Sequence, residues 1–169
     1  MNYILIGQRR NGEIEKLERY LILKKKNFLS VGFDSYLQNR NQIKIEKFEK
    51  GESKTQQFYS FFYINSFNKI VTLINFFILY LYIIFKIKKF ENSIAIGVSL
   101  FPSLICYTLK LQKKTKHFVY YNQDFYLPDK SLSSIVFCKI FKFLDHYLYL
   151  KCLKAWNSSI RLDKFRSKI

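Results

Sequence analysis

The sequence has few of the residues that build metal and redox sites. It contains three cysteines and two histidines in 169 residues. Cys106, Cys138 and Cys152 form no Cys-x-x-Cys pair, and neither histidine belongs to a set of paired metal ligands. This pattern argues against a metal cluster and against a dithiol redox couple. We expect three free thiols, buried in a reducing compartment.

Acidic residues are also scarce. The 12 Asp and Glu are outnumbered by 29 Lys and Arg, which gives a formal net charge of +17. Such a balance favours anionic partners, either nucleic acid or an acidic lipid surface, although a compositional drift toward lysine would produce it without any partner. Zinc-finger spacing, an RNP-like aromatic pattern and a KH-type glycine loop are missing from the sequence. We therefore expect no specific nucleic-acid partner and keep an anionic membrane surface as a candidate.

No uncharged apolar run reaches the length of a membrane-spanning helix. Residues 70–85 carry no charge, but a spanning helix needs about 20 apolar residues. A packed or membrane-grazing helix is favoured, and the flanking lysines leave insertion as the alternative. The apolar run at residues 3–6 is shorter than a signal-peptide core, and Arg9 and Arg10 follow it. We expect a cytoplasmic protein that is peripheral to the inner membrane face.

Short apolar runs alternate with helical periodicity along the chain. The predicted strands are 3–6, 28–33, an edge strand at 43–48, Ser93–Val98 and 117–121. The predicted helices cover 13–26, 70–85, 102–112 and 131–154, and a solvated loop is predicted at 50–54. Buried strands separated by helices indicate parallel βαβ units. The fold class is therefore predicted to be α/β, a Rossmann-like parallel sheet flanked by helices, in one domain covering residues 1–169.

Polar and aromatic residues gather after two of these strands. A Ser-Leu-Phe-Pro turn follows Ser93–Val98, and the sequence Tyr-Tyr-Asn-Gln-Asp-Phe-Tyr-Leu-Pro lies at the end of the next strand. The long helix then carries Asp145 and leads into Trp-Asn-Ser-Ser-Ile-Arg. Parallel sheets bind ligands in the loops that leave the carboxyl ends of their strands, so chemistry is expected in these segments.

This order of motifs resembles the amino-terminal half of a GT-B glycosyltransferase of the family 4, or group 1, type. The matching residues are Ser99, Pro102, Tyr120, Tyr121, Asp124, Phe125, Tyr126, Pro128, Asp145, Trp156, Asn157, Ser159 and Arg161. The chain differs from the family pattern at Cys152 and Leu153, where an Ala-Asp pair is common, and at Ile160, where a proline is usual. The resemblance implies an acceptor-side domain whose carboxyl-terminal, nucleotide-sugar-binding domain is missing or supplied by a partner chain.

The resemblance also implies an activity, namely sugar transfer from a nucleotide-sugar donor to a glycan or lipid-linked acceptor at the cytoplasmic membrane face. No cofactor and no metal are expected on this half, and the nucleotide-sugar donor is expected for the complete enzyme. The isolated chain should be inactive. The alternative is a small membrane-associated basic binding protein without catalytic activity, and charge-driven nucleic-acid binding ranks behind both.

Glycosyl transfer needs a group that orients or deprotonates the acceptor hydroxyl. Asp124 is the candidate for this role, and its alternative role is to cap a turn or pair with a lysine. The acceptor-binding candidates are Asn122, Phe125, Tyr126, Ser99 and Arg161. The candidates for contact with the donor diphosphate are Gly7, Gln8, Arg9 and Arg10. Glycine allows close backbone approach and arginine can bind phosphate bidentately, but the sequence lacks a Gly-x-Gly-x-x-Gly pattern.

Overall fold

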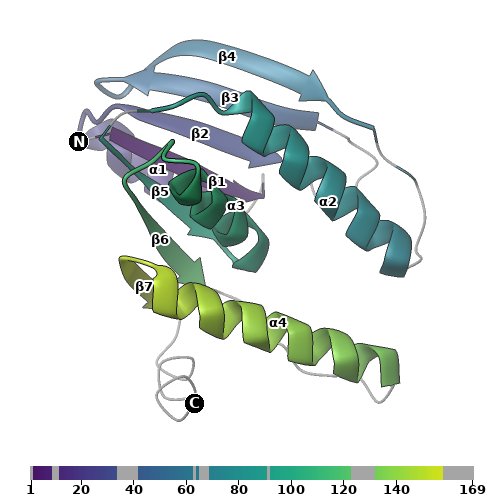
Figure 1. The fold of residues 1–169 in the computed structure, drawn as a ribbon. Helices are drawn as coiled ribbons and strands as arrows, with labels where there is room; N and C mark the ends of the chain where they lie inside the picture. The colour runs from purple at the N-terminus through teal and green to yellow at the C-terminus, as the bar shows by residue number, and fades with distance from the viewer. Residues whose placement is uncertain are drawn as a thin grey trace.

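The computed structural model describes residues 2–8, 12–33, 42–62, 64, 69–90, 92–122 and 132–157. In this part of the chain, strands and helices alternate around one sheet (Figure 1). The strands are β1 (Asn2–Gln8), β2 (Phe28–Phe33), β3 (Gln42–Glu49), β4 (Glu52–Ser60), β5 (Ser93–Val98), β6 (His117–Asn122) and β7 (Lys154–Asn157). The helices are α1 (Gly12–Leu23), α2 (Lys69–Lys86), α3 (Leu100–Leu111) and α4 (Leu132–Lys151).

The seven strands form a mixed sheet in the order β4-β3-β2-β1-β5-β6-β7. The neighbours from β2 through β1, β5 and β6 to β7 are all parallel. β3 and β4 form an antiparallel hairpin at the other edge. The predicted α/β, Rossmann-like fold class is confirmed, with an antiparallel extension that the prediction did not contain.

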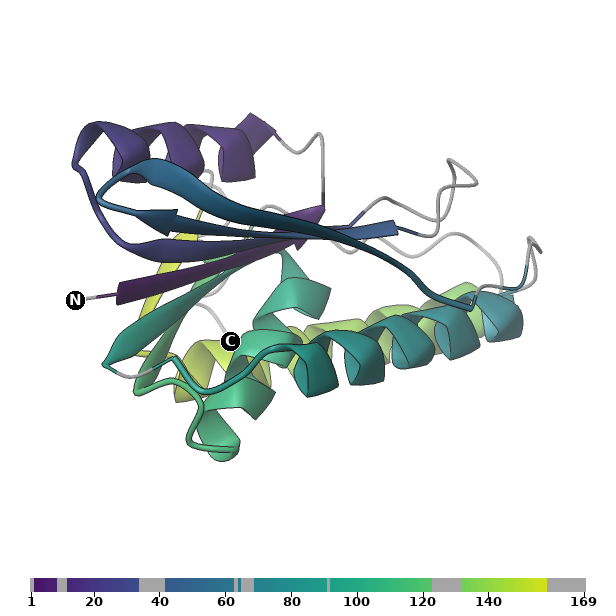
Figure 2. The same ribbon diagram turned by 90° about the horizontal axis from the view of Figure 1, so that it is seen from above.

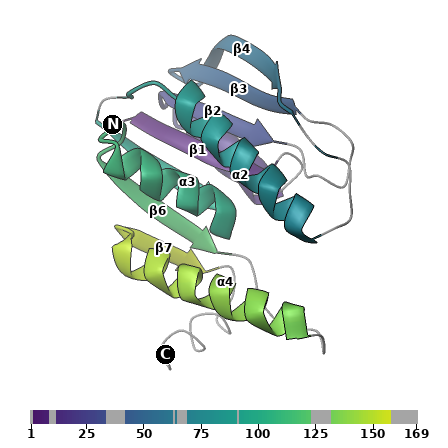
Figure 3. The ribbon, with the colours of Figure 1, turned by 45° about the vertical axis from the view of Figure 1, so that its right-hand side comes forward.

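The helices divide unequally between the two faces of the sheet. α1 lies alone on one face, and α2, α3 and α4 lie together on the other (Figure 2). Figure 3 shows these three helices side by side in front of the sheet. Parallel strands are joined by right-handed crossovers, so the side on which a new strand is added decides which face its connecting helix covers. The chain first adds β2 on one side of β1 and later adds β5 on the other side, so the helices change face between α1 and α2. We call α2, α3 and α4 the helical layer.

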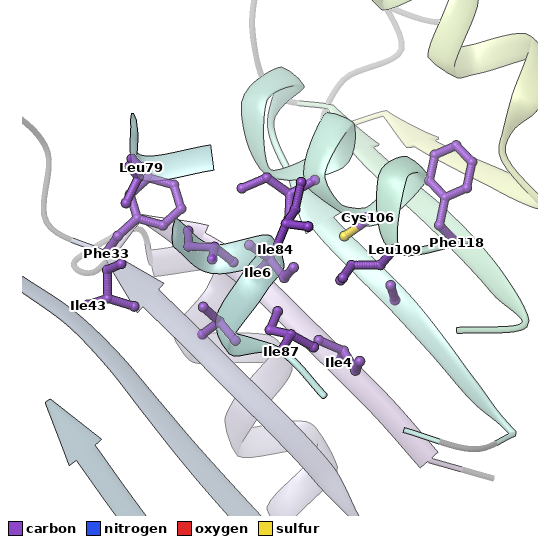
Figure 4. Close-up of a cluster of buried hydrophobic side chains, with 14 of the residues drawn as sticks. Ile4, Ile6, Phe33, Ile43, Leu79, Ile84, Ile87, Cys106, Leu109 and Phe118 are labelled. Atoms are coloured by element: carbon purple, nitrogen blue, oxygen red, sulfur yellow. The ribbon is translucent and has the colours of Figure 1, made fainter. Parts of the chain in front are cut away.

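Alternating residues of β1 supply both cores. Ile4 and Ile6 point toward the helical layer and pack with Ile84, Ile87 and Leu109 (Figure 4). The residue between them, Leu5, belongs to the opposite core, which α1 covers. A strand buried on both faces needs apolar residues at every position, which explains why β1 is a continuous apolar run rather than an alternating one.

The secondary structure differs from the prediction in several details, and one is that the helix predicted at 13–26 ends at Leu23. The predicted edge strand, β3, is internal, because β4 pairs with its outer side. The predicted loop at 50–54 is only a two-residue turn at Lys50 and Gly51, whose φ angles of 52° and 81° suit a tight hairpin. The predicted helix at 131–154 ends at Lys151, and β7 follows it.

Candidate functional site

The carboxyl ends of β1 and β5 mark the switch point of the sheet. The chain leaves β1 for α1 on one face, and it enters β5 from α2 on the other face (Figures 1 and 2). The two strands are paired in parallel, with Ile6 opposite Gly97. Open α/β sheets bind ligands in the crevice outside such a switch point, so this edge is the candidate functional site.

Gly7 at the end of β1 allows α1 to pack closely. A Cβ atom at this position would lie 2.9 Å from Cδ1 of Ile14 and 3.4 Å from Cβ of Val98. Gln8, the last residue of β1, is half-buried. Arg9 and Arg10, the other two residues predicted to contact a diphosphate, lie outside the described residues.

Ser99 links the ends of β5 and β6. Its backbone N–H donates to the carbonyl of Tyr121 at 2.8 Å, and its own carbonyl accepts from the N–H of Ser103 at 3.2 Å. Its φ angle is 81°, which is uncommon for a residue other than glycine. Backbone strain of this kind persists only where the surrounding structure holds it, and it is frequent at ligand sites.

Gly97, two residues earlier, brings α3 against β5. A Cβ atom at this position would lie 2.5 Å from both Cα and N of Ser103. The Ser103 hydroxyl is buried and donates to the carbonyl of Gly97 at 2.9 Å. The start of α3 is therefore fixed directly beside the switch point.

Tyr121 connects β6 to α1 on one side of the candidate site. Its hydroxyl donates to Oε2 of Glu13 at 2.9 Å, and Nζ of Lys16 donates to Oε1 of the same carboxylate at 2.8 Å. The hydrogen bond from Lys16, followed by that from Tyr121, lowers the pKa of Glu13 below its usual value. The ring of Tyr121 also packs edge-on against Trp156 of β7, with ring centroids 6.3 Å apart.

Tyr120 makes the equivalent connection on the opposite face of β6. This residue is fully buried, and its hydroxyl donates to Oδ1 of Asp145 in α4. Two consecutive residues of the Tyr-Tyr motif thus bind helices on opposite faces of the sheet. The carboxyl end of β6 is held from both sides.

The remaining predicted site residues are only partly placed by the structure. Asn122 is the last residue of β6, and its backbone is paired in register with Asn157 of β7. Asp124, Phe125, Tyr126 and Arg161 lie outside the described residues.

Sequence reasoning missed Glu13 and Lys16 as neighbours of the motif. The available signal was an acidic residue in the first turn of the helix that follows β1, because that turn starts at the same edge of the sheet.

The described part of the chain contains no group of three or more His, Cys, Asp or Glu side chains that could hold a metal ion. Cys106, Cys138 and Cys152 are free thiols. Burial raises the pKa of the Cys106 thiol, which makes it a poor nucleophile. Among the described residues, no helix has the length and apolar character needed to cross a membrane.

Together, the fold and its switch point define a Rossmann-like α/β domain with a candidate binding edge at the carboxyl ends of β1, β5 and β6. No protein-family model matches the chain, and neither a curated protein nor a solved structure matches it.

Proposed function

We propose that this chain is the acceptor-side domain of a GT-B-type glycosyltransferase. In this proposal it binds a glycan or lipid-linked acceptor at the cytoplasmic membrane face, and a second half or partner chain binds the nucleotide-sugar donor. Asp124 orients or deprotonates the acceptor hydroxyl. Asn122, Phe125, Tyr126, Ser99 and Arg161 contact the acceptor, and the segment from Gly7 to Arg10 approaches the donor diphosphate.

The observation that carries the proposal is the position of the motif residues in the fold. Ser99 and Tyr121 come from separate motifs of the sequence, and the hydrogen bond from the Ser99 N–H to the Tyr121 carbonyl brings the two motifs together. This contact lies beside the switch point, where α/β sheets bind ligands. The Tyr120–Asp145 and Tyr121–Glu13 hydrogen bonds also give motif residues a structural role at that edge.

Acceptor binding can be tested by NMR titration of the chain with a short-chain polyprenyl diphosphate-linked N-acetylglucosamine. We expect amide shifts at Gly7, Ser99 and Tyr121, and we expect Asp124→Asn to weaken binding roughly tenfold through loss of a charged acceptor. The control is Glu52→Gln, which changes an exposed carboxylate at the start of β4 and should leave binding unchanged. A panel of glycan acceptors that leaves these three amides unmoved would contradict the proposal.

Dependence on a second half can be tested by mixing the isolated chain with radiolabelled nucleotide-sugars and lipid-linked acceptors. No transfer is expected, because the residues that bind the leaving nucleotide are assigned to the other half. Robust transfer by the 169-residue chain alone would show that the assignment of two halves is wrong.

The second candidate function is a small, basic membrane-associated binding protein without catalytic activity. Exposed apolar side chains on α2, among them Phe77 and Phe85, favour this candidate. The two functions differ in the acceptor titration, because a pure binding protein has no reason to recognise a sugar at the carboxyl edge of its sheet. Carbonate extraction of membranes would then separate a peripheral protein, which is released, from an inserted one.

A further inference from the structure

The outer surface of α2 carries a continuous apolar stripe. Its members are Ile74, Phe77, Leu81 and Phe85, with exposed fractions of 44%, 61%, 36% and 78%. The spacing of three, four and four residues places them on one line along the helix. Scattered exposed apolar residues are normal on a protein surface, but an aligned row of large side chains marks an interaction site. We call these four residues the α2 stripe.

The α2 stripe is separate from the protein core. The opposite side of the helix is already packed against the sheet, where Leu79, Ile83 and Ile84 are at most 4% exposed. Near the start of the helix, the buried Asn75 side chain accepts from the N–H of Ile64 and donates to its carbonyl, at 3.0 and 2.9 Å. The helix is thus anchored on its inner side, and its outer side has apolar surface left to bury.

The helical layer that carries the stripe is rich in lysine. The helical layer and the turns after α2 and α3 (residues 69–90, 100–116 and 132–151) contain one acidic residue, Asp145, which accepts a hydrogen bond from buried Tyr120. The same ranges contain eleven lysines and no arginine. These lysines are Lys69, Lys86, Lys88, Lys89, Lys110, Lys113, Lys114, Lys116, Lys139, Lys142 and Lys151.

We propose that the helical layer binds the surface of an anionic lipid bilayer, with α2 lying in the interface. Phe77, Leu81 and Phe85 enter the boundary between head groups and acyl chains, and exposed lysines of the same layer contact lipid phosphates. Interfacial helices combine these two features, an apolar side and a basic border. This inference deepens the membrane attachment in the proposed function, and it can fail or stand independently of acceptor binding.

Other occupants fit the surface less well. Protein interfaces are depleted in lysine and enriched in arginine, whereas the described part of this layer has eleven lysines and no arginine. A second copy of the chain would bring two lysine-rich surfaces together, which is electrostatically unfavourable. Nucleic acid would satisfy the lysines but leave the α2 stripe exposed to water. A lipid surface satisfies both.

The docked orientation follows from the fold. α2 and α4 extend past the carboxyl ends of the parallel strands, on the side of the sheet away from α1 (Figure 2). A bilayer against the helical layer therefore leaves α1 pointing to solvent. The carboxyl edge with Ser99 and Tyr121 then lies beside the membrane rather than beneath it, where a lipid-linked group could reach it.

The first test is vesicle flotation. We expect the protein to float with vesicles containing about one-third phosphatidylglycerol in phosphatidylcholine, to stay behind with pure phosphatidylcholine, and to dissociate as salt rises. The double variant Phe77→Ser/Phe85→Ser should lower partitioning about a hundredfold or more, because each phenylalanine contributes roughly tenfold or more when its side chain leaves water. Equal binding to neutral vesicles, or no loss in the double variant, would overturn the proposal.

The matched control for the stripe is Leu23→Ser. Leu23 is 80% exposed but lies at the end of α1, on the opposite face of the sheet. Its replacement should leave flotation unchanged, and an equal loss in this variant would refute the assignment to α2. Circular dichroism melting checks that each variant is folded. If the double variant does not fold, Phe85→Trp is used instead, and its tryptophan fluorescence is measured with anionic vesicles. Absence of a blue shift would refute insertion of this position.

The charge contribution is tested with two lysine pairs. Lys88→Gln/Lys89→Gln follows α2, and Lys24→Gln/Lys26→Gln follows α1; all four residues are exposed. The first pair should weaken binding to anionic vesicles roughly 25-fold and the second should have little effect, since each lysine near the surface contributes a factor of about five. Equal effects of the two lysine pairs would refute a specific orientation.

A second copy of the chain is tested as the occupant by measuring self-association without lipid. If the protein self-associates and Phe77→Ser/Phe85→Ser abolishes this, a second copy is the occupant and the proposal is overturned.

Discussion

The two faces of the sheet differ in their acidic residues as well as in number of helices. On one face, α1 and the turn after it (residues 12–26) have three acidic residues and five basic ones. On the other face, the helical layer and its turns have eleven lysines and one acidic residue. Basic residues therefore lie on both faces, and the described part of the helical layer differs in having one acidic residue to offset its lysines.

The faces also differ in how tightly helices approach the strands. At Gly97, backbone atoms of α3 occupy the space that a side chain would need. At Gly7, the nearest atom is the terminal methyl group of Ile14, which can rotate away. Backbone contact therefore holds α3 against β5, whereas α1 meets β1 at Gly7 through the end of a side chain.

The largest expected effect comes from breaking the backbone contact. Gly97→Ala should lower the free energy of unfolding by about 3 kcal/mol, because α3 must move away from β5 to admit the methyl group. Gly7→Ala should cost about 1 kcal/mol, since only the end of Ile14 has to shift. Urea denaturation of both variants measures the difference. Equal losses would mean that the two faces are packed alike.

A smaller effect is expected at the two tyrosines of β6. Tyr120→Phe should lower the free energy of unfolding by about 2 kcal/mol, because it removes a buried donor to the Asp145 carboxylate. Tyr121→Phe should cost about 0.5 kcal/mol, since Glu13 retains its hydrogen bond from Lys16. Thermal unfolding of both variants compares them. A larger loss at Tyr121 would place the stronger connection on the α1 face.

Much of the fold could be predicted because burial leaves a pattern in the sequence. β1, β2, β5 and β6 are apolar runs that were recognised as strands, and α2 was recognised from its uncharged length. β4 was missed because all of its residues except Tyr59 are exposed, so its sequence resembles a solvated loop. β7 was missed because four residues after a long helix are too few to show a strand pattern.

The candidate site was predictable in position but not in its contacts. Parallel topology places strand ends at one edge, so Gly7 and Ser99 could be assigned there from sequence order. The hydrogen bond between Tyr121 and Glu13 joins residues 108 positions apart, and no local pattern contains that information. The α2 stripe was hidden for a related reason. An apolar helix shows which residues are apolar, but only its packing shows which of them remain exposed.

The smallest effect is expected from two carboxylates on the α1 face, which should respond to pH in opposite directions. Burial raises the pKa of Glu18 above 4.5, although the Ser30 hydroxyl donates to it and Lys44 is near. Its contribution to stability is therefore complete below about pH 4.5 and is lost as pH rises through the raised pKa. Glu18→Gln removes this loss of stability, because glutamine does not ionise as pH rises. The variant should melt above the unmodified protein at pH 7, and the two should converge by about pH 4.

Glu13 provides the opposite case on the same helix. Its pKa lies below 4.5 because Lys16 and Tyr121 donate to it. Its contribution to stability is therefore present above about pH 4.5 and is lost as pH falls through the lowered pKa. Glu13→Gln should melt below the unmodified protein at pH 7, and the difference should disappear near pH 3 or lower. Melting curves of both variants across this range test the assignment, and shifts of the same sign would show that burial and hydrogen bonding do not separate the two groups.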